Sequence, residues 1–521
     1  ASYNVVDTVR STTKIKKSIM IDQGLDDGLD PQNRKEALAS NEAQQWLLAE
    51  EQEAESHRYH KTTRLVKREP WMKVYKQRPV YKKKRDTMGL IDRYKVRFTV
   101  AAYAKTMTKG IDYKEKYAAN AHWSTYVLLL TYAATNDYDL TLFDIKTFFL
   151  YGDLPEDESI YMEQIPGREV KGQEDDVHLL LKSIYGHPAA GFHAQKKLNA
   201  CLEAAGFRRS VFDTCLYILE DSSGDVYILA THVDDLAGTG TKGGYNKAVN
   251  CLRKVFEITI MNEPKLLLGV VIERDRSRKR MYLHQGPYVK KLIDDLGVKD
   301  CHPPKSPMEA GVQAELRKGL VAGKTGTLGR ESEYQSIVGK LMWLFKTRYD
   351  IRFAIGLLTR SLLSAGDEHI TRAMRVVKYL VRNPARPIVI DGTAPLTVSA
   401  ASDSDWGGDF KESKSTSGYF VMVGKTVVSC HSQIQRKVTD SVAMAETLAL
   451  AELSKHVQST VGILEDIGVT VPRPIQVVVD NQGVMTQSQT LVNHSASKHY
   501  RVPQSIIREL VVKGFWLINQ T

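Results

Sequence analysis

The sequence has little of what would place it in a membrane or among disulfide-bonded secreted proteins. No apolar run approaches the roughly 18 residues that a membrane-spanning helix needs, so we expect no membrane partner. There are only five cysteines, and none has the paired spacing of a zinc site or a disulfide framework. No signal peptide is recognisable. The simplest expectation is a reducing intracellular compartment.

What the sequence does have is length and positive charge. At 521 residues it is long enough for two to four domains. Its 42% hydrophobic and 26% charged residues are ordinary for a soluble globular protein. The formal net charge of +11 favours a polyanionic partner. Because the sequence begins at Ala1 rather than Met, we expect either a processed piece or a fragment of a longer chain.

Residues 225–240 are the stretch around which the site predictions are organised. An apolar, β-branched run leads to the acidic pair Asp234-Asp235, and a second small-apolar run leads from it to Gly240. This pattern predicts a β-hairpin with two carboxylates at its tip. Two adjacent anions at the end of a buried strand need a counter-charge, and Mg²⁺ suits hard oxygen ligands. An isolated Asp-Asp pair is more often a solvated turn, so the interpretation depends on a third carboxylate.

Residues 139–152 supply that carboxylate. Alternation up to Phe143 predicts a strand with Asp144 at its end, before a short helical or turn segment. Three carboxylates on two neighbouring strands can hold two Mg²⁺ ions about 3.5–4 Å apart, the arrangement used for in-line phosphoryl transfer. We therefore predict a two-metal site at Asp144, Asp234 and Asp235.

These motifs resemble a known family, the reverse transcriptases of copia-type (Pseudoviridae) LTR retrotransposons. The resemblance covers roughly residues 33–521 in the family's motif order. It implies an α+β fold, in which a right-hand polymerase with fingers, palm and thumb precedes a ribonuclease H-like α/β domain. The motifs that carry it are Asp-Ile-Lys-Thr-Phe-Phe-Leu-Tyr-Gly (144–152), Glu-Ser-Ile-Tyr-Met-Glu (158–163), Leu-Lys-Ser-Ile-Tyr-Gly (181–186) and His-Val-Asp-Asp (232–235).

The resemblance also predicts the domain boundaries. We expect an N-terminal arm at 1–34, fingers and palm at 35–285, thumb and connection at 286–394, and the ribonuclease H-like domain at 395–521. The opening segment after Asn33 is predicted to be helical, with Trp46 and Leu47 on its apolar side. A helix at 371–382 carries Arg372, Arg375 and Lys378 on one side. It could lie along a nucleic-acid groove, and a plain amphipathic helix explains it equally well.

The most basic stretch, residues 61–97, interleaves tyrosines with lysines and arginines. This composition suits a phosphate backbone with some base stacking, although a solvated basic face would look the same. By resemblance, Lys95 and Arg97 match the positions that grip the phosphates of an incoming nucleotide. Phe149 matches the aromatic residue that packs under the sugar and excludes a 2′-hydroxyl. On sequence alone, a core role beside Phe148 explains Phe149 equally well.

The chain departs from the family after residue 186. The family usually carries a Gln and a following Trp here, which position template and nucleotide. This chain has Ala189 and Ala194 at those places, and the nearby His187 and His193 do not restore a ligand set. The departure bears on efficient polymerisation, whereas the metal carboxylates remain.

The last predicted domain offers three more acids. One strand ends at Asp403, Glu446 lies on a helix running to about Leu453, and a second strand ends at Asp480. Strand-end Asp, helix Glu and strand-end Asp form the constellation of a ribonuclease H-like site, where two metals activate water against an RNA phosphate. This segment closely resembles the copia-type ribonuclease H domain.

By the same resemblance, Lys498-His499 matches a mobile histidine segment. The family places a fourth aspartate shortly after the strand near Leu517, and this sequence ends at Thr521 without it. The sequence leaves truncation and loss of cleavage both open.

Two functional hypotheses follow. The first is an active RNA-directed DNA polymerase with ribonuclease H, in the cytoplasm or nucleus, using two Mg²⁺ or Mn²⁺ ions per active site. Its partners would be RNA, RNA–DNA hybrid and dNTP. The second is a domesticated, non-catalytic RNA-binding subunit of a large ribonucleoprotein such as a ribosome-like particle, for which an organelle would also be compatible. The changed residues and the missing fourth acid favour the second. We prefer the first, because a structural protein has no physical need for three plus three carboxylates. The oligomeric state stays open.

Overall fold

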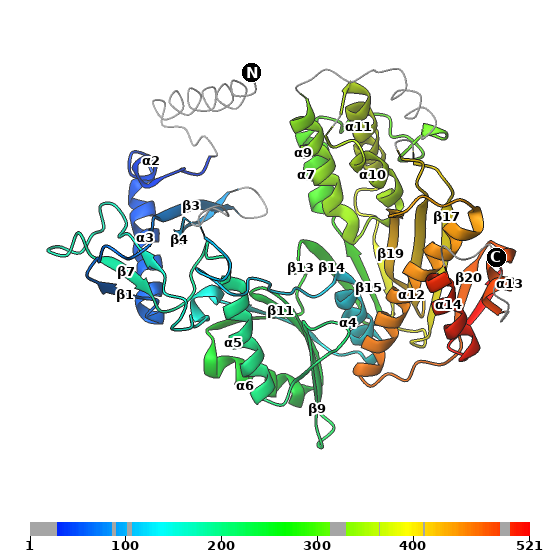
Figure 1. Cartoon of the computed structure of the whole chain (residues 1–521), viewed down its shortest axis with the longest axis horizontal. Coiled ribbons are helices and arrows are strands. Elements are labelled where there is room, and N and C mark those ends of the chain that lie inside the picture. Colours follow the sequence, from blue (N-terminus) through cyan, green and yellow to red (C-terminus); the bar gives the residue numbers. More distant parts are fainter. Residues whose placement is uncertain are drawn as a thin grey trace. The chain divides into compact units, whose positions relative to one another are not determined.

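The structure is a computed structural model that describes residues 29–85, 90–101, 107–312, 330–363, 365–409, 412–489 and 501–520. Most of the predicted N-terminal arm and the Lys498-His499 segment lie outside these residues. The chain forms two compact units (Figure 1). Unit 1 contains residues 1–119, 145–205 and 250–259, and unit 2 contains residues 120–144, 206–249 and 260–521. The four-part division predicted from the family motifs is a different partition and stays a prediction. No helix among the described residues is both long and apolar enough to cross a bilayer.

The described part of unit 1 opens with two helices, where the sequence predicts one. Asn33 caps the short helix α2 (Arg34–Leu38) by accepting a hydrogen bond from the backbone N–H of Glu36 at 2.9 Å. The chain then turns before α3 (Ala43–His60). Trp46 is fully buried, as predicted, but Leu47 is 39% exposed, so that prediction is wrong. Neighbouring residues on a helix point about 100° apart, and only Trp46 faces the strands on which α3 packs.

Those strands form a two-stranded antiparallel sheet, β3 (Gln77–Arg85) with β4 (Ile91–Val100). The Trp46 ring meets the rings of Tyr81 and Tyr94 edge-on, at centroid distances of 5.5 and 4.8 Å. A four-stranded sheet follows in the order β1-β7-β6-β2. The remaining elements of unit 1 are β1 (Thr63–Val66), β2 (Val74–Tyr75), η1 (Phe148–Tyr151), β6 (Tyr161–Met162), β7 (Val177–Leu180) and α5 (Ala190–Ala204).

A six-stranded sheet carries the first set of predicted acids, in the order β12-β5-β11-β10-β9-β8. Helix α4 (Trp123–Asn136), predicted over 123–134, packs on strands β10 and β11. Ten successive α4 residues from Thr125 to Ala134 are buried, which explains their apolar composition. The strands are β5 (Leu140–Ile145), β8 (Arg208–Arg209), β9 (Leu216–Glu220), β10 (Val226–His232), β11 (Asp235–Gly240) and β12 (Ile258–Asn262), and α6 (Lys242–Val255) follows β11.

A four-stranded sheet and a group of helices follow in unit 2. The strands are β13 (Leu266–Leu267), β14 (Val270–Asp275), β15 (Arg280–His284) and β16 (Ile388–Asp391), in that order. The helices share one apolar core and are α7 (Gly286–Asp295), α9 (Glu331–Met342), η2 (Trp343–Lys346), η3 (Tyr349–Ile351), α10 (Arg352–Thr359) and α11 (Asp367–Val381).

The contacts of the cations on α11 bear on whether this helix faces a nucleic-acid groove or is a plain amphipathic helix. Arg372 is buried and pairs with Glu368, and Arg375 pairs with Glu309 at 3.1 Å. Two of the three cations proposed to face a nucleic-acid groove are therefore engaged within the chain, which favours an amphipathic packing helix.

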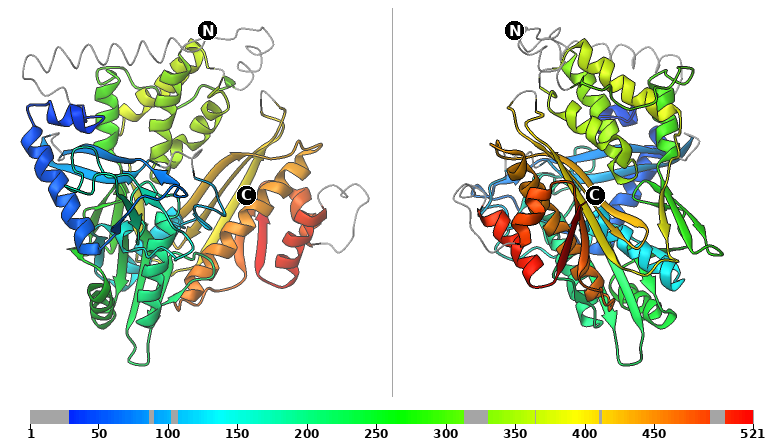
Figure 2. Two further views of the ribbon diagram at one scale, coloured as in Figure 1. Left: turned by 60° about the vertical axis from the view of Figure 1, so that its left-hand side comes forward. Right: turned by 90° about the vertical axis from the view of Figure 1, so that its right-hand side faces the viewer.

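The last sheet has the order β19-β18-β17-β20-β21. Its first three strands pair antiparallel, and β17, β20 and β21 pair parallel. Ser441 caps the long helix α12 (Val442–Asp466), which packs on β17 and β18 and against α14 (Figure 2). The overall class is α+β, as predicted. The elements are β17 (Val398–Asp405), β18 (Thr416–Val423), β19 (Thr426–Ile434), β20 (Ile475–Val479), α13 (Gln482–Gln489), α14 (Arg501–Val512) and β21 (Trp516–Gln520).

Candidate active sites

The predicted hairpin forms and brings the first three acids together at one end of the adjacent strands β5, β11 and β10. His232 pairs with Asp235 across the hairpin, so Val233 and Asp234 make the two-residue turn. On its other side β11 pairs antiparallel with β5, and Asp235 stands directly opposite Asp144. Strand register therefore makes the three acids neighbours. The sequence spacing predicts this for Asp234 and Asp235 within the hairpin, but it does not predict that Asp144 lies opposite Asp235.

The hairpin turn is strained. Val233 has φ +57°, a left-handed conformation that β-branched residues rarely adopt. Such a residue costs on the order of 1–3 kcal/mol and persists only where its surroundings fix it. Here the Asn120 side-chain oxygen accepts a hydrogen bond from the Val233 backbone N–H at 3.2 Å. Asn120 thus holds the turn that carries Asp234.

The hairpin turn and the strand end beside it concentrate negative charge. Desolvation by the surrounding protein, together with the neighbouring Asp234 and Asp144 carboxylates, raises the pKa of Asp235 to about 6. Among the residues that the structure describes, no Lys or Arg forms an ion pair with Asp234 or Asp235. A site of exposed oxygen ligands with excess negative charge fits a hard divalent cation.

The second set of acids converges more closely. Asp403 lies on β17, Glu446 in the first turns of α12 and Asp480 just after β20. One carboxylate oxygen from each lies within 4.8 Å of the others. Ser404 fixes the middle ligand, because its backbone N–H and its hydroxyl donate to Glu446 Oε1 at 3.0 and 2.7 Å.

The other oxygen of Glu446 has no such partner. Within the described residues, Oε2 is buried and accepts no hydrogen bond. Burial, and then the nearby Asp480 and Asp403 carboxylates, raise the pKa of Glu446 to about 7. A buried, unsatisfied carboxylate oxygen between two further acids fits a metal cation, which would supply the missing partner and counter-charge.

The three other predicted site residues, Lys95, Arg97 and Phe149, lie in unit 1. Lys95 and Arg97 alternate with core residues along β4, so they share one face of the strand. Neither forms an ion pair with a carboxylate among the described residues. Burial, with the neighbouring Arg97 and Arg93, lowers the pKa of Lys95.

Other cations of the basic stretch are used within the chain. Lys82 pairs with Asp30 at 2.5 Å, and buried Lys83 pairs with Glu42 at 2.9 Å. The basic stretch is therefore not uniform. Part of it holds the fold of unit 1, whereas Lys95 and Arg97 form no ion pair with a carboxylate of the described residues and are suited to an anion.

Phe149 is half-buried in η1, and the core position beside it belongs to Phe148, which is 4% exposed. Ala189 and Ala194, at the places where the family carries Gln and Trp, are fully buried around the start of α5. Burial lowers the pKa of the neighbouring His187 to about 4, so this ring is neutral at ordinary pH. This segment is packed as core.

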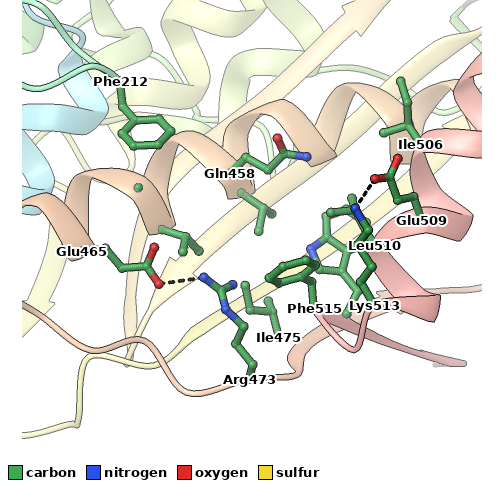
Figure 3. Close-up of a pocket in the computed structure, with 14 residues that line it drawn as sticks. Phe212, Gln458, Glu465, Arg473, Ile475, Ile506, Glu509, Leu510, Lys513 and Phe515 are labelled. Atoms are coloured by element: carbon green, nitrogen blue, oxygen red, sulfur yellow. Dashed lines mark hydrogen bonds and ion pairs between the residues drawn. The ribbon is translucent and has the colours of Figure 1, made fainter.

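A pocket of about 540 Å³ elsewhere in unit 2 is a different feature (Figure 3). It lies along α12 and α14, with Phe212 standing over α12, and it includes none of the six acids. Its charges are internally paired, Arg473 with Glu465 at 2.6 Å and Lys513 with Glu509 at 2.5 Å. We do not assign it to the candidate active sites.

Sequence reasoning missed three residues that support these sites: Ser404, Asn120 and Tyr185. Ser404 could have been found, because it directly follows Asp403 at a strand end. Asn120 is 113 residues from Val233, and nothing in the sequence links the two. Tyr185 stands between Arg97 and Phe149, with ring contacts that only the structure reveals.

Comparison with known proteins gives a match to one protein family. Residues 60–310 match a family model described as "Reverse transcriptase (RNA-dependent DNA polymerase)". This match covers both the basic strands of unit 1 and the three acids of the six-stranded sheet. Residues 60–310 are thus similar to reverse transcriptases, and the relatives that match most of the chain are transposon Pol polyproteins, in agreement with the resemblance that the motifs predict.

Those relatives are Pol polyproteins of plant transposons. The chain is 29% identical over 491 residues to the retrovirus-related Pol polyprotein from transposon TNT 1-94 of Nicotiana tabacum, covering 94% of this chain and 36% of that protein. It is 29% identical over 436 residues to the corresponding polyprotein from transposon RE1 of Arabidopsis thaliana, covering 84% of this chain and 29% of that protein. The chain therefore spans about a third of the length of these relatives. A solved foamy viral protease-reverse transcriptase with an RNA/DNA hybrid aligns at a TM-score of 0.43 and 13% identity, over 92% of this chain and 54% of that chain. A likeness this weak carries no argument.

Proposed function

We propose that this chain is an RNA-directed DNA polymerase with a ribonuclease H activity, and that each activity uses divalent cations, with Mg²⁺ as the natural ion. The observation that carries the proposal is the presence of two separate carboxylate trios, each with excess negative charge, in a chain with a reverse transcriptase region. Carboxylate oxygens suit divalent cations, and a pair of such cations can stabilise the attacking and leaving oxygens of phosphoryl transfer.

In the polymerase site, Asp144, Asp234 and Asp235 would hold the metal ions. Bound Mg²⁺ would stabilise charge on the attacking and leaving oxygens of the phosphoryl transfer. The hairpin and β5 fix these acids, and the proton that Asp235 holds below about pH 6 must leave before a cation binds. The primer 3′-hydroxyl then attacks the α-phosphate of the dNTP and pyrophosphate leaves.

On unit 1, Lys95 and Arg97 would bind triphosphate oxygens, because neither is held in an ion pair by a carboxylate that the structure describes. Phe149 would contact the sugar of the incoming nucleotide and disfavour a 2′-hydroxyl. The Phe149 ring is only half-buried, whereas Phe148 is held in the core.

In the ribonuclease H site, Asp403, Glu446 and Asp480 would hold metal ions against the RNA strand of a hybrid. Ser404 orients the Glu446 carboxylate toward this position. Glu446 must lose its proton near neutral pH, so its ionisation and cation binding are linked. The scissile phosphate would be attacked by water and the 3′-oxygen would leave.

The alternative of a non-catalytic RNA-binding subunit is not favoured. The relatives are transposon Pol polyproteins, and both acid trios are retained. Ala189 and Ala194 are fully buried, and neither belongs to a trio.

The test is primer extension on poly(rA)/oligo(dT) with Mg²⁺, comparing the wild-type chain with the double variant Asp234→Asn/Asp235→Asn. We expect extension by the wild type and its loss in the double variant. Asp139→Asn is the matched control, because Asp139 is an exposed acid just before β5 that pairs with Arg276. Its extension should match the wild type. Absence of extension with tight, salt-sensitive RNA binding that the double variant keeps would overturn the polymerase proposal and favour the RNA-binding alternative.

A further inference from the structure

We propose that Tyr185 is a positioning residue that couples the triphosphate-binding cation Arg97 to the sugar-contacting Phe149. The inference rests on the proposed polymerase function and adds a residue to its nucleotide site. All three residues belong to unit 1, so the argument uses contacts within one compact unit.

The Tyr185 ring touches both partners. The Arg97 guanidinium carbon lies 5.1 Å from the centre of the Tyr185 ring, within the range of a cation–π contact. The Phe149 ring meets the same tyrosine at a centroid distance of 5.5 Å and an interplanar angle of 85°, the favoured edge-to-face arrangement. One aromatic ring therefore carries a cation contact and an aromatic contact at once.

The backbone of Tyr185 is fixed against the strand that carries Arg97. Its carbonyl oxygen accepts a hydrogen bond from the Val100 N–H at 3.0 Å, and it forms a β-bridge with Thr99. The following Gly186 has φ +85°, and a Cβ there would lie 2.4 Å from the Val100 carbonyl oxygen. Only glycine allows this approach. The position of the ring relative to Arg97 is thus set by main-chain contacts.

Holding Arg97 by a ring rather than by an acid has a consequence for ligand binding. A carboxylate partner would neutralise the guanidinium, whereas a ring face orients it and leaves its charge for a phosphate. The buried Nε of Arg97 makes no hydrogen bond within the described residues. The nearby Ala189, fully buried and without a polar side chain, offers no alternative support. Tyr185 is therefore the group that pre-organises Arg97.

Because the same ring meets Phe149, loss of the ring should loosen both contacts together. A single Tyr185 variant would then change both phosphate binding and the discrimination between dNTP and rNTP, although Tyr185 itself is neither a phosphate-binding cation nor the sugar-contacting residue. A merely structural tyrosine would not link these two properties.

The experiment compares Tyr185→Leu, Tyr185→Phe and Tyr94→Leu in extension of oligo(dT) on poly(rA), with dTTP or UTP as the nucleotide. We expect Tyr185→Leu to raise the KM for dTTP about tenfold and to lower the dTTP/UTP discrimination by a similar factor, with kcat nearly unchanged, because one cation–π contact and one aromatic contact are lost. Tyr185→Phe keeps the ring and should restore both values.

Tyr94→Leu is the matched control. Tyr94 is also half-buried on β4, but its ring packs on Trp46, on the opposite face of the strand from Arg97. This variant should lower the thermal unfolding midpoint and leave the discrimination unchanged. The coupling is overturned if Tyr185→Leu keeps the wild-type KM and discrimination, or if it changes only kcat and stability as a packing variant would.

Failure of the proposed function has a different signature. If the wild type does not extend the primer, the polymerase proposal fails. Inorganic tripolyphosphate binding, followed by calorimetry, then tests Tyr185 directly. Weaker binding by Tyr185→Leu than by wild type and Tyr185→Phe would uphold its role toward Arg97, and equal binding would overturn it.

Discussion

The two acid trios of unit 2 are built in different ways. In the six-stranded sheet, Asp234 and Asp235 come from one hairpin whose turn is strained at Val233, and Asp144 joins them by strand register. In the last sheet, the three acids come from two strands and a helix. Of the two trios, only this second one brings one oxygen from each residue within 4.8 Å among the described residues.

The difference follows from what holds each side chain. Glu446 lies on a helix packed against the sheet and is held by two hydrogen bonds from Ser404. Asp144 and Asp235 are exposed near the ends of two paired strands, and their carboxylates repel one another. Glu446 is thus pre-organised by its helix and its hydrogen bonds. The acids at the hairpin come together when a bound cation offsets their repulsion. We expect the two sites to respond differently to the same kinds of change.

The largest expected effect separates the two sites by removing one carboxylate from each. Glu446→Gln should lower RNA cleavage in a hybrid by about 1,000-fold and leave primer extension unchanged. Asp235→Asn should lower primer extension by about the same factor and leave RNA cleavage unchanged. The reason is that metal-site chemistry of this kind depends on each ligand. Glu446→Gln also removes a buried charge, so the metal-free protein should unfold at the same temperature as wild type or higher.

Cleavage of a 5′-labelled RNA in an RNA–DNA duplex and extension of a labelled primer measure the two activities on one preparation. Loss of both activities in either single variant, with an unchanged unfolding temperature, would contradict the picture of two independent sites.

A smaller effect tests the support of Glu446. Ser404→Ala removes the hydroxyl that donates to Oε1 at 2.7 Å and keeps the backbone donor. Removal of such a supporting partner typically costs about 10- to 100-fold in metal affinity or activity. We expect RNA cleavage to fall by that factor and to recover partly at high Mg²⁺, with extension unaffected.

Ser399→Ala, at the other end of β17, is the matched control and should cleave RNA like the wild type. If both serine variants behave alike in a titration of cleavage against Mg²⁺ concentration, Ser404 has no positioning role.

The smallest effect concerns pH. The pKa of Glu446 is raised to about 7 and that of Asp235 to about 6. In the metal-free protein, each raised pKa contributes stability at low pH that is lost as the pH rises through these values. Cation binding must displace the same protons. Lowering the pH from about 8 to about 6 should therefore weaken Mg²⁺ binding about tenfold at the trio that contains Glu446 and about twofold at the trio that contains Asp235.

The Mg²⁺ concentration that gives half-maximal activity, measured for cleavage and for extension at both pH values, reports the two shifts. If this Mg²⁺ concentration shifted equally at the two sites, their carboxylates would not differ in protonation, and the proposed difference between Glu446 and Asp235 would be wrong.

Much of the local architecture was predictable, because it depends on short-range patterns. Apolar or alternating stretches that lead to an acid predicted β5, β10, β17 and β20, and an apolar segment predicted α4. The prediction failed where burial depends on a distant partner. Leu47 is as apolar as Trp46 but is exposed, because only one of two adjacent helix positions faces the strands beneath. Helix α12 continues to Asp466 instead of ending near Leu453, because its later turns still pack in unit 2.

The sequence by itself determined which residues can do chemistry. It supplied two sets of acids at element ends, the family motifs in order, and a hairpin that places Asp234 and Asp235 at one turn. These properties are local, since a turn and a strand end are specified by a few neighbouring residues.

The tertiary structure decided how these groups are held and charged. It placed Asp144 opposite Asp235, left an oxygen of Glu446 buried without a partner, and paired Lys82 and Lys83 with acids. Register, burial and charge pairing join residues that are far apart in the chain, and a linear pattern contains no information about the distance between them.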